Sequence, residues 1–183
     1  MFSINKETGL LKGAIQIESP NYDLRIDEAD ISLIVIHGIS LPPAEFGGGY
    51  IEQFFTNTLD YTQHSYFEEI KDLKVSSHLL IDRVGIVKQF VPFNKRAWHA
   101  GVSEFKNKDC CNDYSIGIEL EGADDIEYTD MQYDILRQVC QCLSAAYSGI
   151  IDENIVGHCD IAPGRKTDPG KSFDWQRFQA KGS

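Results

Sequence analysis

Short apolar runs along the chain predict its strands. Residues 31–37 are apolar and rich in β-branched side chains, which is typical of a strand buried on both faces, and the run ends at His37. Residues 78–82 and 86–91 flank a turn and predict a β-hairpin. A third strand is predicted over residues 115–121, where apolar and acidic side chains alternate.

The alternation in this third strand places Glu119 and Glu121 on the face opposite Ile116 and Ile118. Two interpretations of Glu119 follow. It is either a general base beside a catalytic group or half of an acidic face in contact with solvent. The apolar residues around it favour burial, and a buried carboxylate generally needs a purpose.

Apolar residues at helical spacing predict a long helix over residues 130–147, with Thr129 as its N-cap. Shorter helices are expected at residues 51–56, 66–73 and 172–179. Residues rich in proline, glycine and polar side chains predict loops at 41–50, 92–113 and 157–170. The length of the second of these loops suggests a function.

The order of these elements predicts one domain of the α/β (α+β) class, in which helices flank a mixed central sheet. The chain of 183 residues, 42% of them hydrophobic, is long enough to bury the core of a single domain over residues 1–183. Residues 1–30 carry few periodic signals, so we expect an irregular N-terminal segment followed by a catalytic core over 31–183.

The amino-acid composition limits the classes of partner that the protein is expected to bind. The net charge of −11 argues against nucleic acid, because binding to a phosphate backbone relies on clustered Lys and Arg. The first residues are polar rather than an apolar signal segment, and no run approaches the ~18 apolar residues of a membrane span, so we expect a cytoplasmic protein without a membrane partner. Five cysteines without a CxxC pair indicate reduced thiols.

The loop over residues 157–170 contains the strongest candidate chemistry. It holds His158, Lys166 and Asp168, while His37 ends the first predicted strand. Two histidines and one carboxylate are a familiar ligand set for a catalytic zinc, whose fourth position is left to water. Spacing alone is weak evidence, because buried histidines that only form hydrogen bonds are common.

Competing assignments exist for several of these residues. Lys166 is either a cation beside the metal or a solvated surface lysine, and the second is the commoner case. His64 is expected to be exposed, and His78 to be packed near the site. His99, next to Trp98 in the long loop, is a candidate to face a ligand, whereas Trp98 alternatively fills the core.

Longer stretches of the sequence resemble a known family. They cover residues 37–43 (HGISLPP), 45–48 (EFGG), 91–103 (VPFNKRAWHAGVS), 111–122 (CNDYSIGIELEG) and 157–175. The chain is similar in these stretches to the zinc amidases of the amidase-2 and peptidoglycan-recognition-protein fold group. That group has a mixed sheet with helices on its faces, in agreement with the pattern above.

The resemblance implies a site and a reaction. His37, His158 and Asp168 would bind one Zn²⁺, Glu119 would be the general acid and base, and Lys166 would stabilise the oxyanion. The reaction is hydrolysis of the amide between the lactyl group of a 1,6-anhydro-muramic acid and the first L-alanine of the stem peptide, in cytosolic recycling of peptidoglycan. We expect a monomer with a small-molecule substrate. The substrate-contacting residues suggested in this way are Trp98, His99, Gly38, Lys74, Asn112 and Arg165.

Three residues depart from the pattern of this family. Gly38 stands where an asparagine that contacts substrate is usual, Cys110 where a basic residue commonly precedes Cys-Asn-Asp, and Lys74 where many members have arginine. All three changes concern ligand binding rather than the metal.

Two other functions are the alternatives: an amidase that acts on intact cell-wall muropeptides, and a peptidoglycan-binding module without catalysis.

Overall fold

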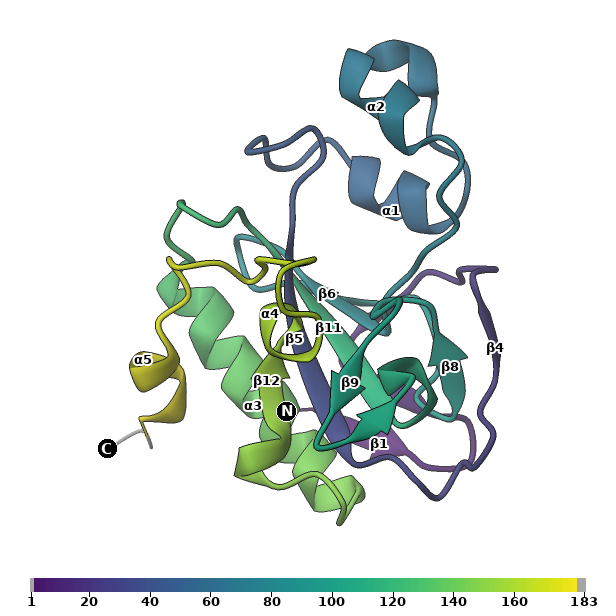
Figure 1. The fold of residues 1–183 in the computed structure, drawn as a ribbon, viewed down its shortest axis with the longest axis vertical. Coiled ribbons are helices and arrows are strands. Elements are labelled where there is room, and N and C mark those ends of the chain that lie inside the picture. Colours follow the sequence, from purple (N-terminus) through teal and green to yellow (C-terminus); the bar gives the residue numbers. More distant parts are fainter. Residues whose placement is uncertain (1, 181–183) are drawn as a thin grey trace.

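The computed structural model describes residues 2–180, and its centre is a six-stranded sheet (Figure 1). The strands have the order β12-β5-β11-β6-β7-β3, and every neighbouring pair is parallel except β6 with β7. Their bounds are β3 Ile15–Gln16, β5 Leu33–Ile39, β6 Leu79–Ile81, β7 Val87–Gln89, β11 Ser115–Glu121 and β12 Ile155–Gly157. The mixed sheet and the three predicted strand regions are therefore confirmed.

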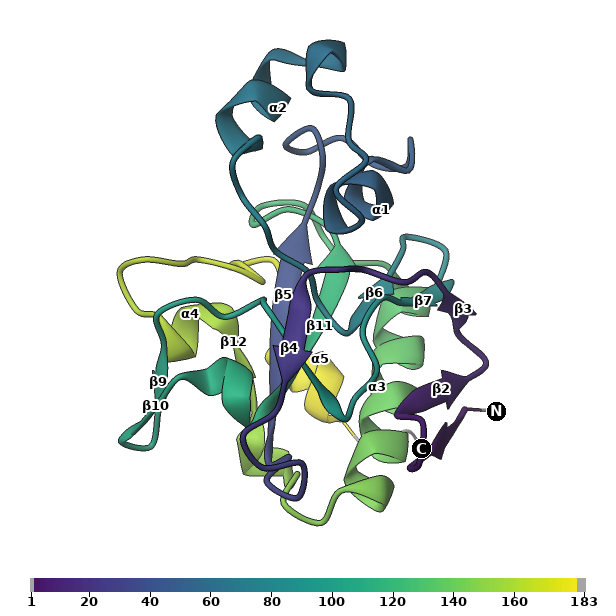
Figure 2. The same ribbon diagram turned by 90° about the vertical axis from the view of Figure 1, so that its right-hand side faces the viewer.

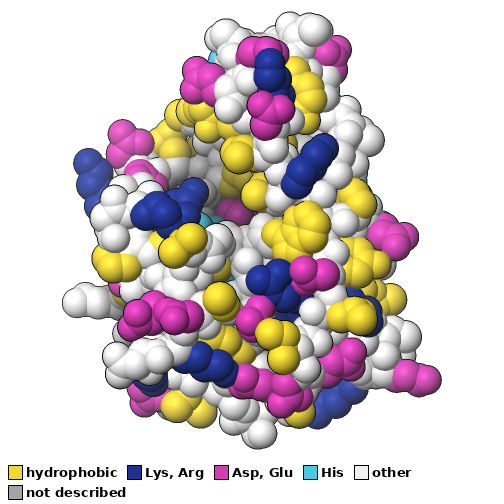
Figure 3. All heavy atoms as spheres, turned by 45° about the vertical axis from the view of Figure 1, so that its right-hand side comes forward, with side chains coloured by type: hydrophobic (Ala, Val, Ile, Leu, Met, Phe, Trp, Pro, Cys, Tyr) yellow, Lys and Arg dark blue, Asp and Glu magenta, His cyan; other side chains and the backbone are white. Residues whose placement is uncertain are grey.

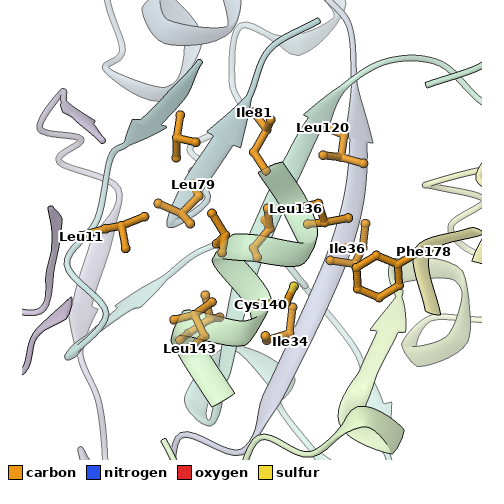
Figure 4. Packing of buried hydrophobic residues seen from close by; sticks show 14 of the residues in the cluster. Leu11, Ile34, Ile36, Leu79, Ile81, Leu120, Leu136, Cys140, Leu143 and Phe178 are labelled. Atoms are coloured by element: carbon orange, nitrogen blue, oxygen red, sulfur yellow. The ribbon is translucent and has the colours of Figure 1, made fainter. Parts of the chain in front are cut away.

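Helix α3 (Asp130–Ala146) covers one face of the sheet. Its side chains Leu136, Cys140 and Leu143 pack against residues of the central strands such as Ile34 and Ile36 (Figure 4). Each fully buried leucine or isoleucine contributes roughly 1.5 to 3 kcal/mol by leaving water. Within residues 2–180, no helix has both the length and the apolar character needed to cross a bilayer.

The predicted N-cap of α3 is also confirmed. The Thr129 hydroxyl accepts a hydrogen bond from the backbone N–H of Gln132, and the Gln132 side chain accepts one from the backbone N–H of Thr129. This reciprocal pair satisfies two backbone donors that the first turn of a helix leaves free.

The other face of the sheet carries two smaller apolar clusters. Helices α1 (Tyr50–Phe55) and α2 (Ser65–Ile70) form a projection beyond the ends of β5 and β11, as Figures 1 and 2 show. Phe54, Phe55 and Phe67 of this projection belong to one cluster with Leu80 and Phe90 of the sheet region. Helix α4 (His158–Ile161) contributes to the second cluster, which lies against β5. Helix α5 (Trp175–Gln179) lies beside α3.

Two expectations about irregular segments were wrong. The first 30 residues contain four short strands: β1 Ser3–Asn5, β2 Leu10–Lys12, β3, and β4 Tyr22–Leu24. The loop over residues 92–113 contains β8 Lys95–Ala97, β9 Glu104–Phe105 and β10 Lys108–Asp109. Strands of two or three residues are too short to show alternation, and β3 and β4 pair with β7 and β8, which are distant in sequence. Three 3₁₀ turns, η1 Tyr61–Gln63, η2 Cys111–Asp113 and η3 Asp152–Asn154, connect other elements.

Candidate metal centre and active site

The register of the two central strands brings His37 and Glu119 side by side. Strands β5 and β11 are parallel, and Glu119 is the register partner of His37. Paired residues of neighbouring strands point to the same face of a sheet, here the face opposite α3. The strand predicted to end at His37 continues for two more residues, to Ile39.

His158 and Asp168 complete a cluster of three donor atoms with His37. The Nδ1 atoms of His37 and His158 are 3.0 Å apart, and the Asp168 Oδ2 atom lies 3.1 Å and 3.0 Å from them, respectively. Two nitrogens and an oxygen bound to one tetrahedral zinc at 2.0–2.2 Å would be separated by about 3.3 Å. The spacing and chemistry of the three donors therefore fit Zn²⁺.

His158 is the first residue of α4, so the segment predicted as a loop begins with one helical turn. The Nε2 atom of His158 lies 3.1 Å from the carbonyl oxygen of Ala100. Because a carbonyl oxygen only accepts, this nitrogen carries the hydrogen, and in that tautomer the Nδ1 lone pair is available to a metal.

Electrostatics favour the forms of these side chains that bind a metal. Burial, more than any other cause, lowers the pKa of His37 to about 4, so its ring is neutral at pH 7. Burial of Asp168 alone would raise its pKa, but hydrogen bonds and charge from His158 and His37 hold that pKa well below its usual range. A neutral imidazole and an ionised carboxylate are the ligands that zinc requires.

Glu119 and Glu121 have different environments, although they share one strand face. The Oε1 and Oε2 atoms of Glu121 accept hydrogen bonds from the backbone N–H groups of Gly47 and Arg83, respectively. The Oε2 atom of Glu119 is buried without a hydrogen-bond partner among residues 2–180. Burial, and then the negative charge of Asp168, raise the pKa of Glu119 well above its ordinary value. A buried carboxyl oxygen without a partner is costly, and in this respect Glu119 differs from Glu121.

A cavity of about 500 Å³ opens beside these groups. Residues of the α1–α2 projection and the segment after β5, among them Leu41, Phe54 and Tyr66, form an apolar wall. His37, Glu119, His158, Lys166 and Asp168 line the opposite, polar part. Figure 3 shows a recess below the projection with acidic and histidine side chains on its floor. The side chain of Lys166 is exposed at this cavity, as a cation that meets a bound ligand would be.

The structure divides the predicted substrate-contacting residues into two groups. Gly38, Trp98 and His99 line the cavity. Lys74 is exposed between Leu73 and Val75, both of which line it. The remaining two do not belong to the lining. Asn112 is buried and accepts hydrogen bonds from the backbone of His99 and Ala100, whereas Arg165 donates to the carbonyl oxygens of Ala100 and Val102.

Asn112 and Arg165 therefore hold the backbone of residues 99–102, and their expected contact with substrate stays a prediction. Cys110, the third departure from the family pattern, is exposed and directly precedes η2 with a left-handed backbone (φ 57°).

Sequence reasoning missed Tyr128. Its buried hydroxyl donates a hydrogen bond to the carbonyl oxygen of Pro169, next to Asp168. A Cβ atom at Gly38 would lie 2.3 Å from this hydroxyl oxygen, and one at Gly122 would lie 2.3 Å from the Tyr128 ring. The tyrosine thus occupies the space beside two glycines at the ends of β5 and β11. Tyr128 follows Glu121 by seven residues, and nothing in the sequence between them indicates this packing role.

We expect Gly38→Ala to destabilise the protein by about 1 to 3 kcal/mol, because the added methyl group forces the packed Tyr128 ring to move. Urea unfolding measures the change. Tyr128→Phe removes the hydroxyl oxygen that the methyl group meets. Gly38→Ala should therefore lower the free energy of unfolding by less in the Tyr128→Phe background than in the wild type. Strictly additive free energies would show that the two residues do not collide.

Comparison with known proteins agrees with this site. A family model described as N-acetylmuramoyl-L-alanine amidase (Amidase_2) matches residues 27–171. The 1,6-anhydro-N-acetylmuramyl-L-alanine amidase AmpD of Escherichia coli K12 is 54% identical over 173 residues, which cover 94% of each chain. A crystal structure of a selenomethionine derivative of AmpD has a TM-score of 0.91 at 53% identity, with 96% of each chain covered.

A more distant solved structure contains a ligand. AmpDh3 from Pseudomonas aeruginosa, in complex with anhydromuramic pentapeptide, has a TM-score of 0.61 at 27% identity, covering 81% of this chain and 58% of that one. The fold class expected from the sequence and the resemblance of its motifs are both confirmed. The chain belongs to the N-acetylmuramoyl-L-alanine amidase family.

Proposed function

We propose that this protein hydrolyses the amide bond between the lactyl group of a 1,6-anhydro-muropeptide and the first L-alanine of its stem peptide, with one Zn²⁺ per chain. One observation carries the proposal: the unpartnered carboxyl group of Glu119 lies on a strand in register with His37, one of three clustered metal donors. A cavity large enough for a small ligand opens onto both groups.

His37, His158 and Asp168 are the residues that would hold the metal. When bound, Zn²⁺ supplies a Lewis acid that polarises a carbonyl group and lowers the pKa of water to about 7. The hydrogen bond from Nε2 of His158 to the carbonyl oxygen of Ala100 keeps the Nδ1 atom of His158 directed at the site.

Glu119 moves the proton in this reaction. Its carboxylate takes a proton from the attacking water, whose oxygen bonds to the lactyl carbonyl carbon. The same carboxyl group returns the proton to the alanine nitrogen when the carbon–nitrogen bond breaks, so that the products are a free acid and a free amine. The raised pKa of Glu119 suits both steps, because a base that must also act as an acid needs a pKa nearer neutrality than 4.5.

Lys166 offsets the negative charge that develops on the carbonyl oxygen. We expect Lys166→Ala to lower kcat by about 10²- to 10³-fold, which corresponds to about 3 to 4 kcal/mol of barrier, with a smaller change in KM. Steady-state kinetics measure both constants. Lys171→Ala, an exposed lysine outside the cavity lining, is the matched control and should leave both unchanged. An effect on KM alone would make Lys166 a binding lysine.

The choice of substrate follows from the cavity and the relatives. The apolar wall suits the compact bicyclic anhydro sugar, and a solved complex of a relative contains an anhydromuramic pentapeptide. A monomer acting on this small substrate in the cytoplasm is part of the proposal. Sedimentation of the purified protein and fractionation of the native cells test these two points.

Mass spectrometry of reaction mixtures decides among the three functions. The zinc-loaded protein is incubated with an anhydro-muropeptide and, separately, with the same muropeptide carrying an ordinary reducing end. We expect free stem peptide chiefly from the anhydro form. Equal or preferential cleavage of the ordinary form would favour an amidase of intact cell wall. Binding without release of peptide from either form would favour a binding module.

A further inference from the structure

The ring of His99 lies in a slot built into β11. A Cβ atom at Gly117 would be 2.5 to 2.8 Å from the ring atoms Cγ, Nδ1 and Cδ2 of His99, so only glycine leaves room for the ring at this position. Gly117 lies between Ser115 and Glu119 on the same strand face. The histidine therefore packs directly across the strand that carries the proposed base.

Both ring nitrogens of His99 have protein partners. Its Nδ1 atom lies 2.9 Å from Nε2 of His37, and its Nε2 atom lies 3.1 Å from the Ser115 hydroxyl. The rings of His37 and His99 meet edge to face, with centroids 5.0 Å apart and planes at 88°. With the His37 Nδ1 lone pair directed at the metal site, the His37 Nε2–H donates to His99, and the His99 Nε2–H donates to Ser115.

The backbone next to His99 serves the second histidine ligand. The carbonyl oxygen of Ala100 accepts from Nε2 of His158 at 3.1 Å. This segment is itself fixed, because Asn112 Oδ1 accepts from the N–H groups of His99 and Ala100 at 3.2 and 2.8 Å, and Arg165 donates to the Ala100 oxygen. Two consecutive residues thus contact the rear nitrogens of both metal-site histidines.

We propose that His99 is a positioning residue of the metal centre: it fixes the ring orientation and tautomer of His37 through the chain His37–His99–Ser115. This inference rests on the metal site of the proposed function and goes beyond the expectation that His99 contacts substrate. Removing the partner that holds the far nitrogen of a ligating histidine typically weakens metal binding by about 10- to 100-fold.

The competing role makes a different prediction. His99 also lines the cavity, so a residue that only contacts substrate would change KM and leave metal affinity unaltered. A positioning residue changes metal affinity in the absence of any substrate. Zinc affinity of the purified full-length chain, measured by competition with a chromophoric chelator, therefore separates the two roles.

The test uses three variants. His99→Phe keeps a flat ring over Gly117 but removes both nitrogens, and it should weaken zinc binding by about 10- to 100-fold. His99→Asn can place its side-chain oxygen near the position of Nδ1, so it should recover much of this loss. Ser115→Ala leaves the ring unchanged and should weaken zinc binding in the same direction by a smaller factor. The visible absorption of the Co²⁺-loaded protein should shift in His99→Phe, because the ligand geometry relaxes.

Several results would overturn the inference. The first is a His99→Phe variant whose zinc affinity stays within twofold of the wild-type value while its KM is raised. A second is a His99→Asn variant as impaired as His99→Phe. If His99→Phe does not fold, an unchanged zinc affinity in Ser115→Ala overturns it as well. Failure of the proposed function looks different, because the wild-type chain would then bind no zinc or release no peptide.

Discussion

Replacing Glu119 with glutamine is expected to reduce turnover by about 10²- to 10⁴-fold while zinc binding stays stoichiometric. The substitution keeps the size and burial of the side chain but removes its ability to accept and return a proton. Peptide release measured by mass spectrometry gives the rate, and metal analysis of the same preparation gives the zinc content. Near-normal turnover would show that another group moves the proton.

The same substitution should stabilise the metal-free protein at neutral pH by roughly 1 kcal/mol, since an unpaired buried charge is removed. The folded-state pKa of Glu119 is raised above its ordinary value of 4.5, so the wild-type chain loses stability as pH rises from 4.5 through the folded pKa. Thermal unfolding curves of wild type and Glu119→Gln should therefore agree near pH 4 and separate by pH 7.

Glu121→Gln is the matched control on the same strand face. The Glu121 carboxylate accepts hydrogen bonds from two backbone N–H groups. The neutral amide of glutamine would weaken these bonds, so the substitution should lower stability instead of raising it. Its turnover should stay closer to that of the wild type than the turnover of Glu119→Gln. If both variants shift stability in the same direction, the distinction between the two carboxyl groups is wrong.

Removing Asp168 is expected to abolish zinc binding and turnover together. In Asp168→Ala, two histidine nitrogens remain and the carboxylate of the site is lost. Loss of a direct ligand should weaken zinc binding by more than the ~100-fold seen when a supporting partner is removed. Metal content after dialysis and peptide release under the same conditions measure the two effects.

Asp125→Ala provides the control for this experiment. Asp125 also lines the cavity but lies outside the cluster of three donors, so its removal should leave the zinc content unchanged. An Asp168→Ala protein that keeps one zinc per chain would exclude Asp168 as a ligand. Loss of turnover with full zinc content would instead indicate a role in binding substrate.

Much of the fold was predictable because its central elements are long and regular. Strand β5, strand β11 and helix α3 each extend over at least seven residues, so their periodic patterns are clear. Strands β3 and β4 have two and three residues, and their pairing depends on partners far along the chain. Local sequence carries little information about such pairs.

The three clustered donors were named from the sequence, whereas the residues that support them were not. The residue types and the family resemblance pointed to His37, His158 and Asp168, and the parallel register of β5 and β11 explains why Glu119 is adjacent to His37. Alternation alone did not separate Glu119 from Glu121, which only the family resemblance distinguished, because the partners of the second carboxylate come from tertiary contacts. For the same reason Asn112 and Arg165 were expected at the substrate, although both bind backbone.

The projection formed by α1 and α2 contributes an apolar wall to the cavity but none of the three metal donors. The donors come from β5, from α4 and from the loop after α4, so residues of the 41–75 segment that line the cavity can change without replacing a donor. The apolar wall of the cavity and the three donors thus lie on different segments of the chain. For protein engineering, exchanging this segment between relatives would change the cavity wall while the three donor residues are kept.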